Sequence, residues 1–227
     1  MKKLLTVLLA AGVMTTAAAP SFATPTLRLT SGAVTKTVVD NAANDATEES
    51  GVVGYMGSVG DFSLSVTTGV TKPYQGDEYN PYLDLNSLSG TSGKAGTLKL
   101  EFTETGFLSI DNVLYLLSQI GGTINNANGS SLTYDVYADA SNAAFGTGTQ
   151  LLHAQYGTGA FSNTDFLKGD LTNPFSLTIV ATLTHGAGGT SSFDAFVGVP
   201  EPTTLGLLGI GVLALGRTRK KHKSKSL

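Results

Sequence analysis

The chain has 227 residues and no cysteine, which excludes disulfides, thiol nucleophiles and thiolate metal sites. Its formal net charge is −3, but residues 24–199 hold only six of the 14 Lys and Arg and 16 of the 17 Asp and Glu, so this middle segment carries −10. Such a surface is a poor partner for nucleic acid or anionic lipid.

The N-terminus has the order of a secretory signal peptide. Met1-Lys2-Lys3 is cationic, Leu4–Val13 is apolar, and small residues stand at Ser21 and Ala23. This order predicts a signal peptide over residues 1–23, exported through the Sec translocon and cleaved by signal peptidase after Ala23. A buried N-terminal helix is the alternative interpretation.

Residues 24–199 are long enough for one sizeable core and predict a single exported domain. Apolar and polar residues alternate in several runs rich in Thr, Val and aromatics, as expected of strands buried on one face. The runs are Leu27–Leu29, Phe62–Thr67, Leu98–Thr103, Leu132–Val136 and Phe175–Thr184. With about 12% glycine and no amphipathic helix, this pattern predicts an all-β, antiparallel β-sandwich of jelly-roll or Ig-like type.

Glycine-rich stretches predict the turns. Ser89–Gly93 and Gly186–Gly189 read as turns, and the second is expected to join Phe175–Thr184 to Ser192–Val197 in a final hairpin. The apolar run Phe107–Ile120 fits either a buried strand or a short helix, and we favour a strand.

No catalytic motif is present in the sequence. It contains neither H-E-x-x-H nor G-x-S-x-G, and of its three histidines only His153 and His185 lie in the middle segment. We expect His185, which precedes a glycine loop, to face solvent. No catalytic residue is assigned, and we expect the protein not to be an enzyme.

One loop has the composition of a carbohydrate-binding surface. Tyr74, Tyr79 and Tyr82 surround Asp77 in the stretch YQGDEYNPYLD. Tyrosine rings can stack on sugar rings, and a carboxylate can accept hydrogen bonds from hydroxyls. The alternative is a solvated loop whose tyrosines cover a sheet edge.

A second loop concentrates oxygen ligands. Asp40, Asp45 and Glu48 lie in DNAANDATEE and form a candidate calcium site, although their spacing is not that of an EF-hand. Asn and Asp are also ordinary turn formers, so a plain acidic turn is the alternative. No other cofactor is expected.

The C-terminus has three parts in order. Pro200-Glu201-Pro202 forbids helix and favours an extended segment. Residues 203–216 form an apolar run that as a helix spans about 21 Å, short of the ~30 Å hydrocarbon core, and so predicts a transient rather than a permanent membrane anchor. The tail, residues 217–227, holds cations that retain this end in the cytoplasm. They are Arg217, Arg219, Lys220, Lys221, Lys223 and Lys225.

These three parts together resemble the PEP-CTERM sorting signal. In that family the signal is read by a membrane enzyme, exosortase, in Gram-negative bacteria that make exopolysaccharide. The resemblance implies that Pro200, Glu201 and Pro202 are the processing motif and the basic tail the stop-transfer element. It also implies passage through the inner membrane to the cell surface or extracellular matrix.

The middle segment resembles one largely uncharacterised group of PEP-CTERM proteins. The similarity lies in GVVGYMGSVGDFSLSVTTGVTKP, YLDLNSLS and TLTHGAGGTSSFDAFVGVPEP, and it implies a sandwich at the cell surface without implying a reaction. We therefore expect a structural or adhesive role in a biofilm or exopolysaccharide matrix. A carbohydrate-binding module is the alternative, and a polysaccharide hydrolase is a more remote one.

Overall fold

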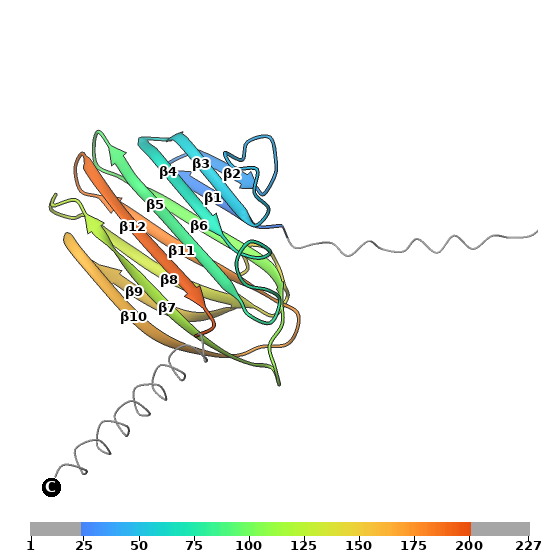
Figure 1. The fold of residues 1–227 in the computed structure, drawn as a ribbon. Coiled ribbons are helices and arrows are strands. Elements are labelled where there is room, and N and C mark those ends of the chain that lie inside the picture. The colour runs from blue at the N-terminus through green and yellow to red at the C-terminus, as the bar shows by residue number, and fades with distance from the viewer. Residues whose placement is uncertain (1–23, 201–227) are drawn as a thin grey trace, which may run out of the picture.

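The computed structural model describes residues 24–200, and these residues form two antiparallel β-sheets packed face to face (Figure 1). The expected all-β sandwich is thereby confirmed. Within residues 24–200 no helix is long and apolar enough to cross a membrane. The strands are β1 (Thr26–Ser31), β2 (Val34–Val39), β3 (Val52–Val59), β4 (Phe62–Val70), β5 (Tyr82–Ser92), β6 (Gly96–Phe107), β7 (Val113–Ile124), β8 (Ser131–Asp139), β9 (Thr149–Tyr156), β10 (Gly159–Asp170), β11 (Phe175–His185) and β12 (Gly189–Gly198).

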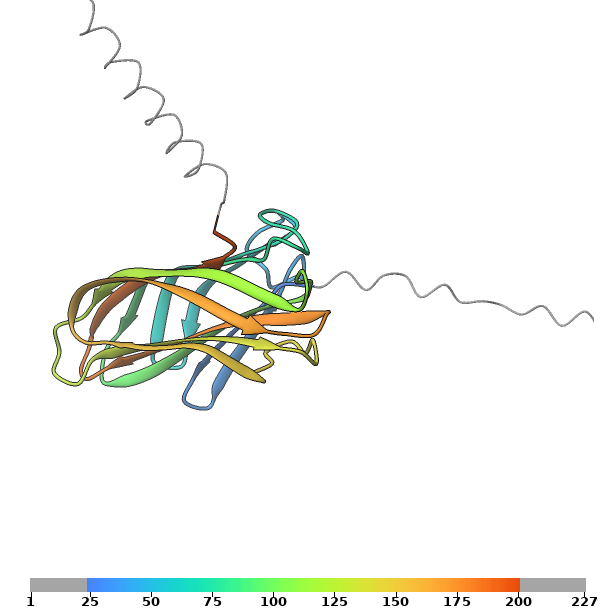
Figure 2. The same ribbon diagram turned by 90° about the horizontal axis from the view of Figure 1, so that it is seen from below.

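Most connections pass from one sheet to the other. The first sheet has the order β2-β1-β6-β11-β8-β9 and the second the order β10-β7-β12-β5-β4-β3. Chain neighbours such as β5 and β6, or β9 and β10, therefore lie in opposite layers, as Figure 2 shows from below. Contacts of β2 with β3 and of β9 with β10 bring the sheets together at both edges.

The core lies between the sheets and consists of the inward residues of the alternating runs. In β6, for example, Leu98, Leu100 and Phe102 are fully buried. Removing apolar side chains from water is the main favourable term in folding, about 25 cal/mol per Å². The largest fully buried side chains are Phe62, Phe102, Phe107, Tyr134 and Phe175.

Two buried polar contacts join the layers. Tyr134 of β8 and Ser118 of β7 share a hydrogen bond of 2.9 Å between their hydroxyls. At the end of β11, His185 lies between Ser92 Oγ, 2.7 Å from Nδ1, and Ser191 Oγ, 2.8 Å from Nε2. The expectation that His185 faces solvent was wrong: its ring is 1% exposed, and burial lowers its pKa. Each contact satisfies polar groups that would be costly to bury alone.

The structure corrects the predicted final hairpin and one predicted turn, and it settles a third segment. β11 and β12 do not form a hairpin, because β11 pairs with β6 and β8 while β12 pairs with β5 and β7. The stretch Ser89–Ser92 continues β5 instead of forming a turn. Phe107–Ile120 is extended, as favoured, but it contains the end of β6, a turn and the start of β7.

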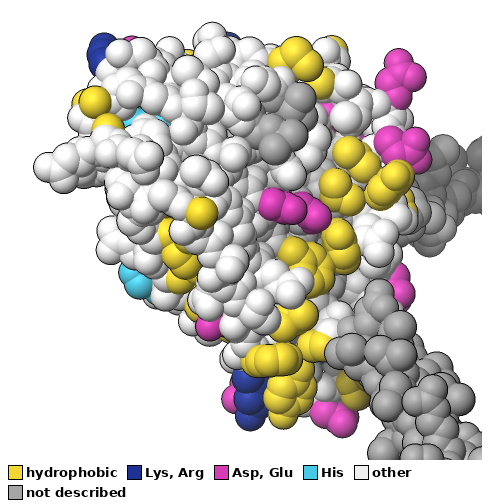
Figure 3. Space-filling view, turned by 60° about the vertical axis from the view of Figure 1, so that its left-hand side comes forward, with side chains coloured by type: hydrophobic (Ala, Val, Ile, Leu, Met, Phe, Trp, Pro, Cys, Tyr) yellow, Lys and Arg dark blue, Asp and Glu magenta, His cyan; other side chains and the backbone are white. Residues whose placement is uncertain are grey.

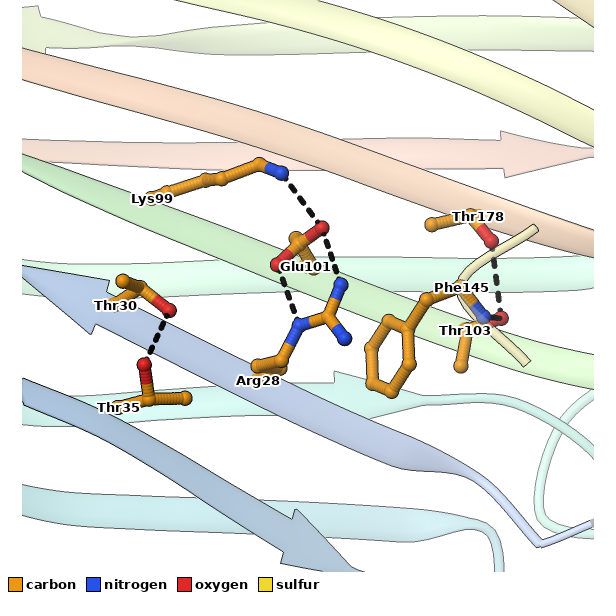
Figure 4. A network of polar contacts seen from close by, with 8 residues as sticks. All are labelled: Arg28, Thr30, Thr35, Lys99, Glu101, Thr103, Phe145 and Thr178. Atoms are coloured by element: carbon orange, nitrogen blue, oxygen red, sulfur yellow. Dashed lines mark hydrogen bonds and ion pairs between the residues drawn. The ribbon is translucent and has the colours of Figure 1, made fainter. Parts of the chain in front are cut away.

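A polar network covers the outer face of the first sheet (Figure 4). Arg28 of β1 and Glu101 of β6 are cross-strand partners and form a two-pronged ion pair at 2.6 and 2.7 Å. Lys99 donates a further hydrogen bond of 2.8 Å to Glu101, and the Arg28 guanidinium lies 3.9 Å from the centre of the Phe145 ring. Burial raises the pKa of Glu101, but the hydrogen bonds from Arg28 and Lys99 bring it below its usual value. The network ties the loop before β9 to the sheet.

The packing of β4 against β6 gives a test of the core. A Cβ added to Gly69 would overlap the ring of Phe102, which is fully buried. Gly69→Ala is therefore expected to lower the free energy of unfolding by about 1–3 kcal/mol, measured by chemical denaturation. Gly93→Ala is the matched control, because its Cβ would meet nothing within 4 Å. Equal stability of the two variants would contradict this packing.

Candidate functional site

The chain leaves the sandwich at the end of β12, a central strand of the second sheet. β12 is hydrogen-bonded to β5 on one side and β7 on the other. The next residue, Val199, donates a backbone hydrogen bond of 3.1 Å to Pro81 and packs against the core. A side chain at Gly198 would collide with the Phe196 ring. The segment that follows therefore starts from a fixed point on the surface.

An open hollow of about 430 Å³ lies at this point. Its walls come from the loop before β5, the turn between β6 and β7, the start of β7 and the end of the described chain. The lining residues are Tyr79, Leu108, Ser109, Ile110, Asp111, Val113, Leu114, Tyr115 and Val199. The hollow is mostly apolar, and the residues with polar groups in its wall are Asp111, Ser109, Tyr79 and Tyr115.

The loop before β5 is held by its own hydrogen bonds. The Asp77 carboxylate accepts hydrogen bonds of 2.8 Å from the backbone N–H groups of Tyr79 and Asn80, and one of 2.7 Å from the Asn80 side chain. The Asn80 side chain above all lowers the pKa of Asp77. Glu78 accepts a backbone hydrogen bond of 2.7 Å from Leu108, which joins the loop to the turn after β6. Asp77 therefore caps a turn.

The structure separates the three tyrosines of the predicted carbohydrate site. Tyr74 and Tyr79 are 57% and 53% exposed, and Tyr79 faces the hollow. Tyr82 instead begins β5, is half-buried, and contacts Phe196 with ring centres 5.0 Å apart. Both oxygens of the fourth residue, Asp77, are engaged in its turn. Tyr74 and Tyr79 remain the candidates for sugar contact.

An apolar band crosses the outer face of the second sheet beside this exit. Strand register aligns Phe166 with Leu117, Leu117 with Gly198, and Gly198 with Tyr82. We define the apolar band as the side chains of Phe166, Leu117 and Tyr82 together with those of Ile110, Tyr115 and Phe196. Figure 3 shows hydrophobic side chains gathered down this face. Phe166, Ile110 and Tyr115 are 81%, 75% and 61% exposed.

Sequence reasoning did not identify the band, although it left a signal. Val113–Leu117 is a continuous apolar run in β7, and Phe166-Leu167 is an adjacent apolar pair in β10. In a strand, neighbouring side chains point to opposite faces, so such runs place one apolar residue outside for each one inside. Which outward residues become neighbours depends on strand order, which the runs do not reveal.

Two carboxyl groups lie within the band's sheet face. Asp84 of β5 stands opposite Phe196 in the register, and Asp194 of β12 is its neighbour. Burial, followed by the Asp194 carboxylate, raises the pKa of Asp84 to about 6. The Tyr82 hydroxyl lies 3.5 Å from Asp84 Oδ2. At mildly acidic pH Asp84 is therefore partly protonated, and this part of the sheet face carries less negative charge.

The predicted calcium loop is organised by hydrogen bonds to its own backbone. Asp45 Oδ1 accepts from Thr47 and Gly54, its Oδ2 accepts from Asn41, and Asp40 Oδ2 accepts from Gly51. Glu48 is exposed. Among residues 24–200, no three His, Cys, Asp or Glu side chains are placed to hold a metal ion. The described geometry does not assemble a calcium site from Asp40, Asp45 and Glu48.

The other histidine of the described chain pairs with an acid at the first sheet's edge. His153 Nδ1 lies 2.6 Å from Asp135 Oδ1, which also accepts a hydrogen bond of 2.8 Å from Gln150. His153 is exposed on β9. The contact links β8 to β9.

The segment leaving β12 can be assigned by comparison with known proteins. A family model described as "PEP-CTERM protein-sorting motif" matches residues 198–220, from the last residue of β12 onward. The chain carries a PEP-CTERM sorting motif. The motif indicates an exported protein with a C-terminal sorting signal, directed to the cell surface, with exosortase as its processing partner. The sequence matches no curated protein.

Most of the PEP-CTERM motif lies outside the described residues. Pro200 is described and half-buried, whereas Glu201, Pro202, the apolar run 203–216 and the basic tail 217–227 are not. The predicted signal peptide, with its cleavage site at Ala23, also falls outside. These assignments remain predictions from the sequence.

The loop before β5, which lies beside the end of β12, begins at a buried ion pair between Lys72 and Glu104. Lys72 Nζ donates a hydrogen bond of 2.8 Å to the Thr105 carbonyl and lies 3.6 Å from Glu104 Oε1. Glu104 is fully buried, and its Oε1 also accepts a hydrogen bond from the Thr105 N–H. Burial raises the pKa of Glu104 to about 7 despite the opposing effect of Lys72.

The raised pKa of Glu104 predicts a pH-dependent stability. Between the ordinary carboxyl pKa of 4.5 and about 7, the folded chain keeps a proton that the unfolded chain has lost. Glu104 therefore makes stability fall as pH rises through this window and adds no further change above it. The free energy of unfolding of Glu104→Gln minus that of the wild type should therefore rise by on the order of 2–3 kcal/mol when the pH is raised from 5 to 8. Denaturant titration at each pH measures this difference.

Glu101→Gln is the control for this measurement. Because the pKa of Glu101 is lowered, its contribution is present at neutral pH and is lost on acidification. The two variants should therefore change the pH dependence in opposite directions. Parallel pH profiles for wild type and Glu104→Gln would show that Glu104 titrates normally.

Proposed function

We propose that this chain is an exported, non-catalytic structural or adhesive protein of the cell surface or exopolysaccharide matrix. Signal peptidase removes residues 1–23, and residues 203–216 hold the chain briefly in the inner membrane with the basic tail inside. Exosortase then acts at Pro200-Glu201-Pro202 and releases the sandwich. The sorting motif that begins at the last residue of β12 is the observation that carries this proposal.

The composition of the body supports an extracellular role of this kind. Its formal charge of −10 favours solubility and disfavours binding to nucleic acid. Strands hydrogen-bonded into two sheets, without cysteine, give a body that does not depend on the redox state of its surroundings. Both properties suit a component of a hydrated matrix.

The contacts of Val199 support processing on its C-terminal side. Val199 is hydrogen-bonded to Pro81 and packs against the core. Cleavage before it would remove a wall residue of the hollow, whereas cleavage after it keeps both β12 and this wall residue. We therefore expect the released form to end between residues 200 and 204.

Replacing Pro200-Glu201-Pro202 by three alanines tests the proposal. The variant is expected to accumulate at full C-terminal length in the inner membrane, because the extended processing segment is lost. Fractionation followed by intact mass measurement of membrane, surface and medium forms gives the result. Met56→Ala, at an exposed position on β3, is the control and should be released like the wild type. Unaltered release of the triple variant would refute exosortase-dependent processing at this motif.

A carbohydrate-binding module is the second candidate. Its support is the exposed Tyr79 ring on a hollow that also contains Asp111 and Ser109, with exposed Tyr74 in the same loop. An aromatic face with nearby polar groups is the usual composition of a sugar-contacting surface. A hydrolase is the more remote alternative, and we expect the purified body to release no reducing sugar from exopolysaccharide.

Alanine substitution tests the carbohydrate candidate. The double variant Tyr74→Ala, Tyr79→Ala should lose retention on the producer's own exopolysaccharide by at least about tenfold, because each stacked ring contributes on the order of 1 kcal/mol. Retention is measured by affinity electrophoresis. Met56→Ala, which removes an exposed apolar side chain on β3, is the matched control. Unchanged retention in the double variant would leave the structural role as the better explanation.

A further inference from the structure

We propose that the apolar band rests on the surface of the bilayer in which the chain is anchored. The occupant is the interfacial region of a zwitterionic lipid membrane, contacted while the sorting signal is still attached. The inference rests on the transient anchoring stage of the proposed function. It assigns a role to a surface that the processing motif alone does not use.

Chain continuity places this part of the sandwich close to the membrane. Pro200 is the last described residue, and the apolar run begins at Thr203, three residues later. Three fully extended residues span at most about 11 Å. The hollow, which includes Val199, therefore lies within about one headgroup layer of the point where the chain enters the bilayer. Any anchored orientation brings a surface around Val199 towards lipid.

The side chains at that surface suit an interface. The two most exposed of the large apolar residues within 24–200 are Phe166 and Ile110, and both belong to the band. Tyr115 is 61% exposed beside them, and its register partner Lys168 extends from β10. Tyrosine and phenylalanine rings bury apolar surface at the headgroup level, and a lysine there can keep its ammonium in water.

Charge selects the kind of lipid. Asp84 and Asp194 lie on the same sheet face, Asp111 lines the hollow, and the body as a whole carries −10. Anionic headgroups would repel these carboxylates. Contact with the band is therefore driven by apolar burial, and it should be stronger on phosphatidylcholine than on phosphatidylglycerol.

The chain's own apolar run is a weaker occupant. Residues 203–216 cannot lie in the bilayer and on the band at the same time. Folding back onto the band would also require a reversal within Pro200-Glu201-Pro202, where two prolines favour extended backbone. A polysaccharide occupant would not need the band to lie beside the membrane entry point.

A single tryptophan can report on the contact, because the chain contains none. The chain from Thr24 to Leu227 carrying Phe166→Trp is reconstituted into phosphatidylcholine vesicles with and without brominated acyl chains. We expect at least about twofold quenching by the brominated lipid and a blue-shifted emission, because the indole enters the interface. Phe166 is 81% exposed, so tryptophan fits there without repacking. Tyr115→Trp is a second reporter with the same expectation.

Met56→Trp is the matched control. Met56 is 66% exposed on β3, the edge strand opposite β10, about five strand spacings or roughly 24 Å away. Its tryptophan should show no quenching. Adding phosphatidylglycerol to the vesicles should reduce quenching at position 166, and an increase would contradict an apolar contact.

The outcomes separate this inference from the proposed function. If the chain floats with the vesicles but position 166 is not quenched, the anchor holds and the band contact is refuted. If the chain does not float, both the anchoring stage and the contact fail. A blue shift at position 166 without quenching, or a shift produced only by exopolysaccharide, identifies another occupant and also overturns the inference.

Discussion

The arrangement of this protein depends on the fact that its sorting signal continues directly from a central strand. β12 is hydrogen-bonded on both sides, by β5 and β7, and the PEP-CTERM motif begins at its last residue. A signal attached to a flexible linker would leave the body free to orient at random. Here the hydrogen bond from Val199 to Pro81 fixes the starting point of the signal. The hollow and the apolar band consequently surround that point.

The sandwich that fixes β12 is built from strands that alternate between layers. Seven of the eleven connections pass between the sheets, so strands that follow one another in the chain often lie in different layers. The polar contacts of Tyr134 and of His185 lie within this interface and link the layers by side-chain hydrogen bonds. They satisfy buried polar groups, and they require the two sheets to keep one relative position.

Under the proposed function, the same surface faces different surroundings before and after processing. While the signal is attached, the chain entry point lies within a few residues of the band, and lipid is the nearest apolar medium. After release, the exposed tyrosines of the hollow and its polar wall face the matrix. A strongly acidic body with an apolar band at one end is compatible with both proposed stages, because charge keeps it soluble and the proposed lipid contact ends when the anchor is removed.

The sequence by itself determined the PEP-CTERM sorting motif, the all-β class and several buried strands. These are local properties: a sorting motif depends on a short order of residues, and a strand depends on alternation over a few positions. The run Leu98–Thr103 lies in β6, and its apolar residues are buried in the core, as its pattern predicted.

Tertiary structure decided which strands pair and what gathers at the exit. The glycine loop after His185 is compatible with a hairpin and with a connection between the two sheets. The pairing of β11 and β12 with different neighbouring strands selects the connection between sheets. Likewise Phe166, Leu117 and Tyr82 are remote in sequence and meet through strand order. Such neighbours arise from long-range pairing, whose register depends on the whole buried face and not on any single segment.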